Sequence, residues 1–198
     1  MRLAVFSVGT DTASRLGMVQ GDRVIDLTTL AGWSGPTLRS VMDLLHLGPD
    51  AARRLADVAG RAASGATGRG YGTDEIRWHA PVPRPSKNVF CLGRNYADHA
   101  RESARARGES VTVPQHPVFF TKAPTSVTGP YDQIPLDPSL TEQLDWEAEL
   151  GVILGSGGRN IRRADAMRHV FGYTAINDVT ARDLQQRHLQ WFKGKSLD

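Results

Sequence analysis

The first part of the chain has short apolar runs, and longer stretches with apolar residues at helical spacing follow them. A turn-forming QGDR segment interrupts one of the apolar runs, and Gly48 followed by Pro49 divides the helical stretch. This pattern predicts short strands followed by two helices, at residues 2–8, 17–27, 40–48 and 49–63. We therefore predict a small N-terminal domain of strands and helices over residues 1–70.

A second region begins after a glycine-rich polar segment. Residues 64–75 contain several glycines and few apolar residues, which is typical of a linker. From Ile76 onward the pattern is punctuated by prolines, and NVFCLG at 88–93 predicts a buried strand. We therefore predict a larger unit over residues 76–198.

Composition narrows the class of protein. Hydrophobic residues make up 40% of the 198 residues, so the chain can build a core. The net charge of +3 is too small to indicate a nucleic-acid binder. The single cysteine, Cys91, allows no disulfide within the chain, and no apolar run approaches the ~20 residues that span a bilayer. We expect a soluble cytoplasmic protein without nucleic-acid or membrane partners, with Cys91 as a buried, inert thiol.

Carboxylates and apolar residues alternate from residue 145 onward. Side chains of a strand point to opposite faces in turn, so the alternation predicts one strand over 145–154 with Asp145, Glu147 and Glu149 on the same face. The apolar side chains of this strand are expected to face a core, namely those of Trp146, Ala148, Leu150, Val152 and Leu154. The sequence thus predicts a strand with one apolar face and one acidic face.

The acidic face has two interpretations. Exposure to water suits Asp145, which follows a polar loop, but it suits Glu149 less because the apolar GVILG comes directly afterwards. Two adjacent carboxylates also suit a hard divalent cation such as Mg²⁺ or Mn²⁺. Asp178 is a third candidate oxygen ligand, because it lies between a predicted strand and a helix that begins near Thr180. Asp178 can equally be a cap of that helix.

Four segments of the second region resemble the fumarylacetoacetate hydrolase (FAH) family. They are NVFCLGRNYADHARE, PVFFTKAPTSVTGP, DWEAELGVILG and GYTAINDVTARDLQ, and their order and spacing agree with the family over roughly residues 80–198. The resemblance implies an α+β fold that is mainly β, in which a mixed β-sandwich roll follows a small N-terminal domain. It also implies a homodimer.

The resemblance implies a divalent metal site and a class of substrate. By position, the metal ligands are Glu147, Glu149 and Asp178, and the metal is Mg²⁺ or Mn²⁺, with Ca²⁺ as a substitute in crystals. Members of the family cleave, decarboxylate, isomerise or hydrate small keto acids. Their common chemistry is an enolate that the metal stabilises.

A histidine and a glutamate in NYADHARE form a candidate acid–base pair. His99 and Glu102 are three residues apart, so a helix would place them on one face. Taken alone, the segment also suits an exposed helix with surface charges. The resemblance implies instead that the pair activates water and lies on a short helix that closes over the substrate.

Four further polar residues are candidates for contacts with the substrate. Arg182 and Gln185 follow Asp178 at about one and two helical turns, and the resemblance implies that they bind substrate. Lys122, in FFTKAP, matches a position that contacts the substrate carboxylate. Lys195 matches the lysine that stabilises an oxyanion, and the W-x-x-x-K spacing favours it over Lys193. For each lysine, a solvated surface charge is the alternative.

These expectations lead to a predicted function and to its rivals. We predict a metal-dependent hydrolase or decarboxylase of small β-diketo or 2-keto acids. The alternatives are an isomerase or hydratase of unsaturated keto-diacids, and a non-catalytic module that needs a partner chain. Family members continue past the position of Asp198, and Lys195 lies where chain ends usually fray. We therefore expect the 198-residue chain alone to bind metal weakly and to lack turnover.

Overall fold

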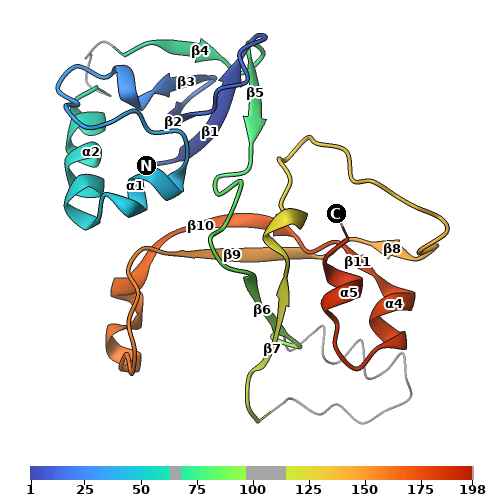
Figure 1. Cartoon of the computed structure of the whole chain (residues 1–198). Helices are drawn as coiled ribbons and strands as arrows, with labels where there is room; N and C mark the ends of the chain where they lie inside the picture. Colours follow the sequence, from blue (N-terminus) through green and yellow to red (C-terminus); the bar gives the residue numbers. More distant parts are fainter. Residues whose placement is uncertain (63–67, 97–114, 198) are drawn as a thin grey trace. The chain divides into compact units, whose positions relative to one another are not determined.

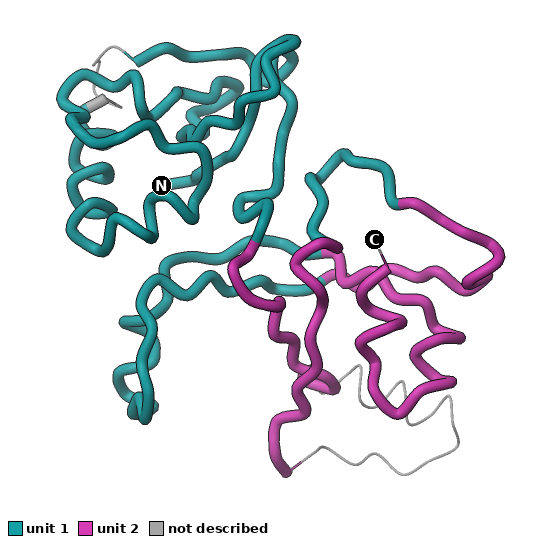
Figure 2. Tube along the Cα trace, in the orientation of Figure 1, with its two compact units in different colours: residues 1–84, 127–134, 149–176 teal, residues 85–126, 135–148, 177–198 magenta. Residues whose placement is uncertain are grey.

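The computed structural model describes residues 1–62, 68–96 and 115–197 (Figure 1). The chain forms two compact units, each assembled from several segments (Figure 2). The first unit contains residues 1–84, 127–134 and 149–176, and the second contains residues 85–126, 135–148 and 177–198. Each unit is described below by itself.

An antiparallel sheet of five strands forms the centre of the first unit. The strand order is β4-β3-β2-β1-β5, and every neighbouring pair is antiparallel. The turn between β2 and β3 contains Gly21 at a φ of 62°, a conformation that glycine adopts without strain. The strands are β1 (Leu3–Val8), β2 (Arg15–Gln20), β3 (Arg23–Asp26), β4 (Gly70–Gly72) and β5 (Ile76–His79).

Two helices, α1 (Val41–His46) and α2 (Pro49–Ala62), pack their apolar sides against this sheet. Helix α1 begins with a capping box between Ser40 and Asp43. In this box, the side chain of each residue accepts a hydrogen bond from the backbone N–H of the other. The shared core includes fully buried side chains from the strands, the short helix η1 (Leu27–Thr29) and both α-helices. Examples are Val5, Leu16, Leu27, Leu44 and Leu55. Both predicted helices are confirmed.

The border between the units differs from the predicted split. Strand β4 lies inside the segment predicted to be a linker. This strand belongs to the first unit's core, because Tyr71 is 5% exposed and its ring packs against that of Phe6 at 5.6 Å. Strand β5 begins at Ile76 and pairs with β1, so the segment predicted to open the second region completes the first sheet. The glycines around Tyr71 mark an edge strand of that sheet as well as a chain connection.

The predicted acidic strand is divided into two strands. Strand β8 (Leu144–Asp145) ends before Trp146, and β9 (Ala148–Leu154) begins after Glu147. Strand β9 pairs with β10 (Val170–Asn177), and the short helix η3 (Arg163–His169) precedes β10. The break allows Glu147 to leave the alternation that the sequence predicts.

The prediction that the even-numbered residues of this segment face a core is wrong. Their large side chains are between 49% and 71% exposed, in Trp146, Leu150, Val152 and Leu154. The odd-numbered face is covered instead: Gly151 is buried beside Thr174 and Ile176, and Ile153 packs against the core of the first unit. Apolar alternation identified the two faces of the strand but not which face the chain covers.

The second unit combines two small sheets with short helices. Strands β6 (Val89–Gly93) and β7 (Val118–Lys122) form one antiparallel pair, and β8 pairs with β11 (Thr180–Ala181). The helices are η2 (Pro124–Ser126), α4 (Arg182–Arg187) and α5 (Phe192–Lys195). Helix α5 lies against β7, where the rings of Phe120 and Trp191 meet edge to face at 5.4 Å.

Strand β6 is a strand as predicted, but it is not buried on both faces. Phe90 is 69% exposed and Leu92 is 46% exposed, whereas Cys91 on the other face is half-buried. The prediction of a fully buried strand with a buried thiol is therefore wrong. The described elements confirm a mixed α+β fold in which strands predominate. None of the described helices is long and apolar enough to cross a membrane.

Candidate active site

Backbone pairing brings Glu147 and Asp178 together. Strands β8 and β11 pair with Thr180 opposite Asp145, which aligns the residues that flank both acids. Beyond this pairing, the Asp178 N–H donates to the Glu147 carbonyl oxygen at 2.8 Å, and the Glu147 N–H donates to Asn177 Oδ1 at 3.1 Å. These bonds fix two acids that are 31 positions apart in the sequence side by side.

Lys195 lies between these two acids. Its Nζ donates to Glu147 Oε2 and to Asp178 Oδ2, each at 2.8 Å. Because both distances are the same, the two oxygens are no more than twice that distance apart. The Lys195 side chain is 2% exposed and that of Asp178 is 5% exposed, so water screens these charges weakly. Among the two rivals, Lys195 is the buried lysine, and Lys193 is exposed.

Gly194 in α5 explains how Lys195 reaches the acids. A Cβ at Gly194 would lie 2.7 Å from the Gln185 backbone nitrogen and 2.9 Å from the Ala181 carbonyl oxygen, so only glycine permits this approach to α4. After the helix, Ser196 Oγ accepts a hydrogen bond from the Ala123 N–H at 3.0 Å. These close contacts hold the backbone on both sides of Lys195, and the expected fraying stays a prediction.

Lys122 approaches Asp178 from β7. Its Nζ donates to Asp178 Oδ1 at 2.7 Å and to the Val179 carbonyl oxygen at 2.9 Å. Burial lowers the pKa of the Lys122 ammonium, and the Asp178 carboxylate opposes this shift. Each oxygen of Asp178 thus has its own lysine.

Arg182, the first residue of α4, approaches the other acid. Its Nη1 donates to Glu147 Oε1 and to Gln185 Oε1, the latter at 3.2 Å. Its Nε and Nη2 both donate to Asp145 Oδ2, at 2.9 and 2.8 Å. A guanidinium that is held on two sides has little rotational freedom left. Asp145 therefore orients Arg182, a role that the sequence pattern did not assign to it.

Replacing Arg182 with methionine is expected to raise the pKa of the Asp145 carboxyl toward its ordinary value. The hydrogen bond from Arg182 is the main reason that this pKa is lowered, ahead of the bond from the Trp146 N–H. A lowered carboxyl pKa stabilises the fold above the ordinary value, and this contribution is lost as the pH falls through the lowered pKa. Carboxyl-carbon NMR titration measures the shift. Arg187→Met, on the same helix, is the control, and an unchanged Asp145 pKa in Arg182→Met would contradict the pairing.

The remaining predicted residues belong to the other unit or lie outside the described residues. Glu149 is half-buried on β9 and belongs to the first unit, while Glu147 and Asp178 belong to the second. His99 and Glu102 lie outside the described residues. Within residues 1–62, 68–96 and 115–197, no group of three acidic, histidine or cysteine side chains converges as a metal site would.

The donor chemistry of the acidic pair nevertheless fits a hard divalent cation. Both carboxylates bind the same ammonium nitrogen, so two oxygens already converge on one positive charge. Carboxylate oxygen is the ligand type that Mg²⁺ and Mn²⁺ prefer. The arrangement can therefore hold cationic and anionic groups in a buried, weakly screened place, which is the usual environment of charge-stabilising catalysis.

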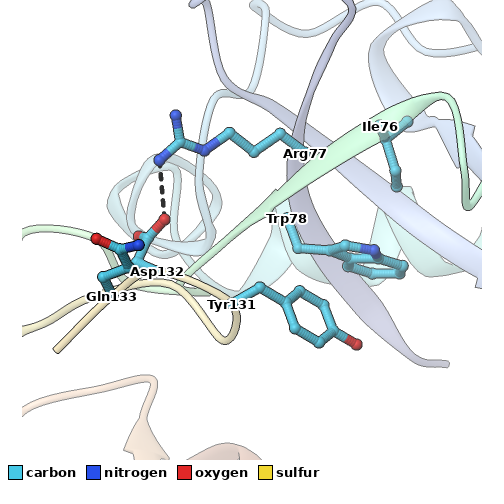
Figure 3. A pocket seen from close by; sticks show the side chains of 6 residues that line it. All are labelled: Ile76, Arg77, Trp78, Tyr131, Asp132 and Gln133. Carbon is cyan, nitrogen blue, oxygen red and sulfur yellow. Dashed lines mark hydrogen bonds and ion pairs between the residues drawn. The ribbon is translucent and has the colours of Figure 1, made fainter.

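A surface cavity in the first unit is a weaker candidate for an active site. It has a volume of about 600 Å³ and is lined by Ile76, Arg77, Trp78, Tyr131, Asp132 and Gln133 (Figure 3). Its two charges neutralise each other, since Arg77 Nη2 lies 2.8 Å from Asp132 Oδ1, and Tyr131 is 82% exposed. The cavity offers no buried acid, base or nucleophile, so we do not assign the chemistry to it.

Comparisons with known proteins agree with the motifs around the acidic pair. The family model for the fumarylacetoacetate (FAA) hydrolase C-terminal region matches residues 88–198. The oxaloacetate tautomerase YisK of Bacillus subtilis is 48% identical over 147 residues, which cover 74% of this chain and 48% of that protein. The human mitochondrial oxaloacetate tautomerase FAHD2A is 44% identical over 126 residues, which cover 63% of this chain and 38% of that protein.

A solved structure extends the agreement to the whole chain. The fumarylacetoacetate hydrolase of Exiguobacterium antarcticum has a TM-score of 0.71 and 36% identity, and the match covers 100% of this chain and 63% of that one. The chain therefore spans half or less of the length of these two tautomerases and under two thirds of this solved structure.

Proposed function

The chain belongs to the fumarylacetoacetate hydrolase family, and from this premise we propose that it serves an enzyme that interconverts the keto and enol forms of a small 2-keto diacid, such as oxaloacetate. The observation that carries the proposal is the buried Lys195 ammonium between Glu147 and Asp178. The names of the two tautomerases support this reaction. A divalent Mg²⁺ or Mn²⁺ cofactor and a homodimer are parts of the proposal that rest on the resemblance.

The proposed reaction moves one proton and leaves the carbon skeleton intact. The O–H bond of the enol breaks and a C–H bond forms at the neighbouring carbon, so no oxidant, reductant or water is consumed. A bound divalent cation would supply charge stabilisation for the anionic oxygen that forms. In this proposal, Glu147 and Asp178 hold the metal, with Glu149 as the third ligand that the resemblance implies.

Cationic side chains of this site are suited to a substrate with two carboxylates. The Lys195 ammonium is a donor for the anionic oxygen that develops during the reaction. Lys122 and Arg182 supply further positive charge within hydrogen-bonding distance of the acidic pair. Gln185 accepts from Arg182 and is the polar neighbour proposed to contact the substrate. These cations are balanced by Asp145, Glu147 and Asp178, and a bound divalent cation would add positive charge, which would favour a dianionic keto acid over a neutral ketone.

Cleavage of a β-diketo acid by water is the second candidate function. The family model that matches the chain describes a hydrolase, and the His99–Glu102 pair suits the activation of water. Hydrolysis requires such a base, whereas a keto–enol exchange requires only a proton carrier. The two functions also differ in their products, because cleavage releases two fragments and the keto–enol exchange leaves the carbon skeleton intact.

One set of assays on the natural protein that contains these residues separates the candidates. Oxaloacetate enriched in the enol form is mixed with the protein and Mn²⁺, and the ultraviolet absorbance of the enol is followed beside CO₂ release. Cleavage of an acylpyruvate is measured in parallel. We expect faster loss of the enol with little CO₂ release and little cleavage. Cleavage or decarboxylation that exceeds the acceleration of enol loss would replace the proposed function.

Replacing His99 with alanine is expected to lower kcat for any acylpyruvate cleavage by about 10²–10⁴-fold, because general acid–base catalysis has that magnitude. The affinity for Mn²⁺ should stay unchanged, since imidazole is not among the proposed ligands. Steady-state kinetics and calorimetry measure the two quantities. His116→Ala, at an exposed histidine, is the control. Wild-type cleavage by His99→Ala would show that His99 is not the base.

A further inference from the structure

Every carboxylate oxygen of the acidic pair already accepts a hydrogen bond from a cation. Lys195 Nζ donates to Glu147 Oε2 and to Asp178 Oδ2. Lys122 Nζ donates to Asp178 Oδ1, and Arg182 Nη1 donates to Glu147 Oε1. With Asp145 included, three carboxylates meet three cations, so the group is electrically balanced. A metal that binds Glu147 Oε2 and Asp178 Oδ2 together would meet the Lys195 ammonium, which already lies 2.8 Å from both oxygens.

The three cations differ in how firmly they are held. Arg182 has two further bonds to Asp145, and Lys122 has a second bond to the Val179 carbonyl oxygen. The hydrogen bonds described for Lys195 go only to the two acids, so a metal between them competes for both of its bonds. Lys195 is thus the cation that a metal would displace first.

The Lys195 ammonium has a further contact besides its bonds to the two acids. Lys195 Nζ lies 5.0 Å from the ring centroid of Phe120, a distance at which an aromatic face attracts a cation. The lysine side chain is a flexible stem of four carbons, so its ammonium can move without displacement of the backbone. The ammonium can therefore leave the acids while α5 keeps its contacts with α4.

We propose that Lys195 is an internal counter-ion that occupies the place of a divalent metal between Glu147 and Asp178, and that metal binding displaces its ammonium. This inference rests on the proposed function, because it requires that the two acids bind a metal. It sets an order of events. Without metal, the ammonium is engaged by the acids, whereas after metal binding it is available to an anionic oxygen of the substrate. The metal therefore binds before the keto acid.

Calorimetry with Mn²⁺ tests the displacement without any activity assay. Lys195→Met removes the competing cation, so Mn²⁺ should bind at least about tenfold more tightly than to the wild type, the change expected for one hydrogen bond to a charged group. Lys193→Met removes an exposed lysine of the same helix and should leave the affinity unchanged. Lys195→Gln keeps hydrogen-bond donors without the charge, and it serves as the second variant if Lys195→Met fails to fold.

Two kinds of failure can be told apart. If the wild type binds Mn²⁺ and neither Lys195 variant binds it more tightly, the ammonium and the metal coexist and the displacement is wrong. If neither the wild type nor a folded Lys195 variant binds Mn²⁺, the metal part of the proposed function falls, and this inference falls with it. A nitrogen-15 NMR signal of the Lys195 ammonium gives a second readout: diamagnetic Mg²⁺ should shift it, and an unmoved signal at saturating Mg²⁺ would overturn the displacement.

Discussion

Replacing Asp178 with alanine is expected to lower the free energy of unfolding by about 3–5 kcal/mol, the cost of removing one partner from a buried ion pair. Asp178 accepts from the ammonium groups of Lys122 and Lys195, and all three side chains are at most 11% exposed. Lys122 would keep only its bond to the Val179 carbonyl oxygen, and Lys195 would keep only Glu147. Glu147 would then be the one carboxylate for two buried cations. Lys195 would bind it directly, and Lys122 would interact with it only at a distance.

Urea unfolding at neutral pH, followed by circular dichroism, measures this loss. Asp57→Ala changes an exposed aspartate on α2 and is the matched control, expected to stay within about 0.5 kcal/mol of the wild type. Asp178→Asn keeps the shape of the side chain and removes only its charge. A loss below about 1 kcal/mol in Asp178→Ala would mean that the lysines find other partners or water, and the buried network would not be as described.

The described secondary structure was predictable to the extent that local periodicity governs it. Residues 40–63 carry apolar residues at helical spacing and strong end signals, and α1 and α2 lie there. The segment from Gly70 to His79 has glycines and polar residues, so its pattern favours a linker. The burial of Tyr71 depends instead on the ring of Phe6, and the pairing of β5 depends on the free edge of β1. Both partners lie more than 60 positions earlier in the chain.

The acidic pair was predictable as residues but not as an arrangement. The E-x-E spacing and the acid in NDVTARD indicate the oxygen donors, and the family motifs select the lysine four residues after Trp191. Which cation meets which oxygen depends on Gly194, whose missing side chain allows α5 to approach α4. Such a contact leaves no trace in hydrophobic periodicity, because it depends on the absence of a single atom.

Asp145 shows what strand alternation misses. The alternation places it on the same face as Glu147, which favours the interpretation of a simple acidic face. In the structure, β8 ends at Asp145, and its carboxylate binds the Arg182 guanidinium through two nitrogens. A pattern of opposite charges, an aspartate before E-x-E and an arginine after NDVTA, is the signal that would have indicated this pair.

Lys195→Met is expected to reduce the rate of enol-to-keto conversion of oxaloacetate by about 10²–10³-fold, the usual effect of removing one preorganised donor to a developing oxyanion. The same variant is expected to bind Mn²⁺ more tightly, so weaker catalysis cannot be attributed to loss of the metal. Lys193→Met carries the same chemical change two residues away on an exposed side chain. Any difference between the two variants therefore reflects the place of the ammonium and not the loss of one positive charge.

The most direct test of the account is the rate of enol loss with the natural protein, its Lys195→Met variant and its Lys193→Met variant, at one saturating Mn²⁺ concentration. Thermal melts of all three proteins establish that each is folded. If the buried cluster of Glu147, Asp178 and Lys195 is the catalytic centre, Lys193→Met retains the wild-type rate and Lys195→Met loses nearly all acceleration. Equal rates for the wild type and a folded Lys195→Met would contradict the assignment of the chemistry to this cluster.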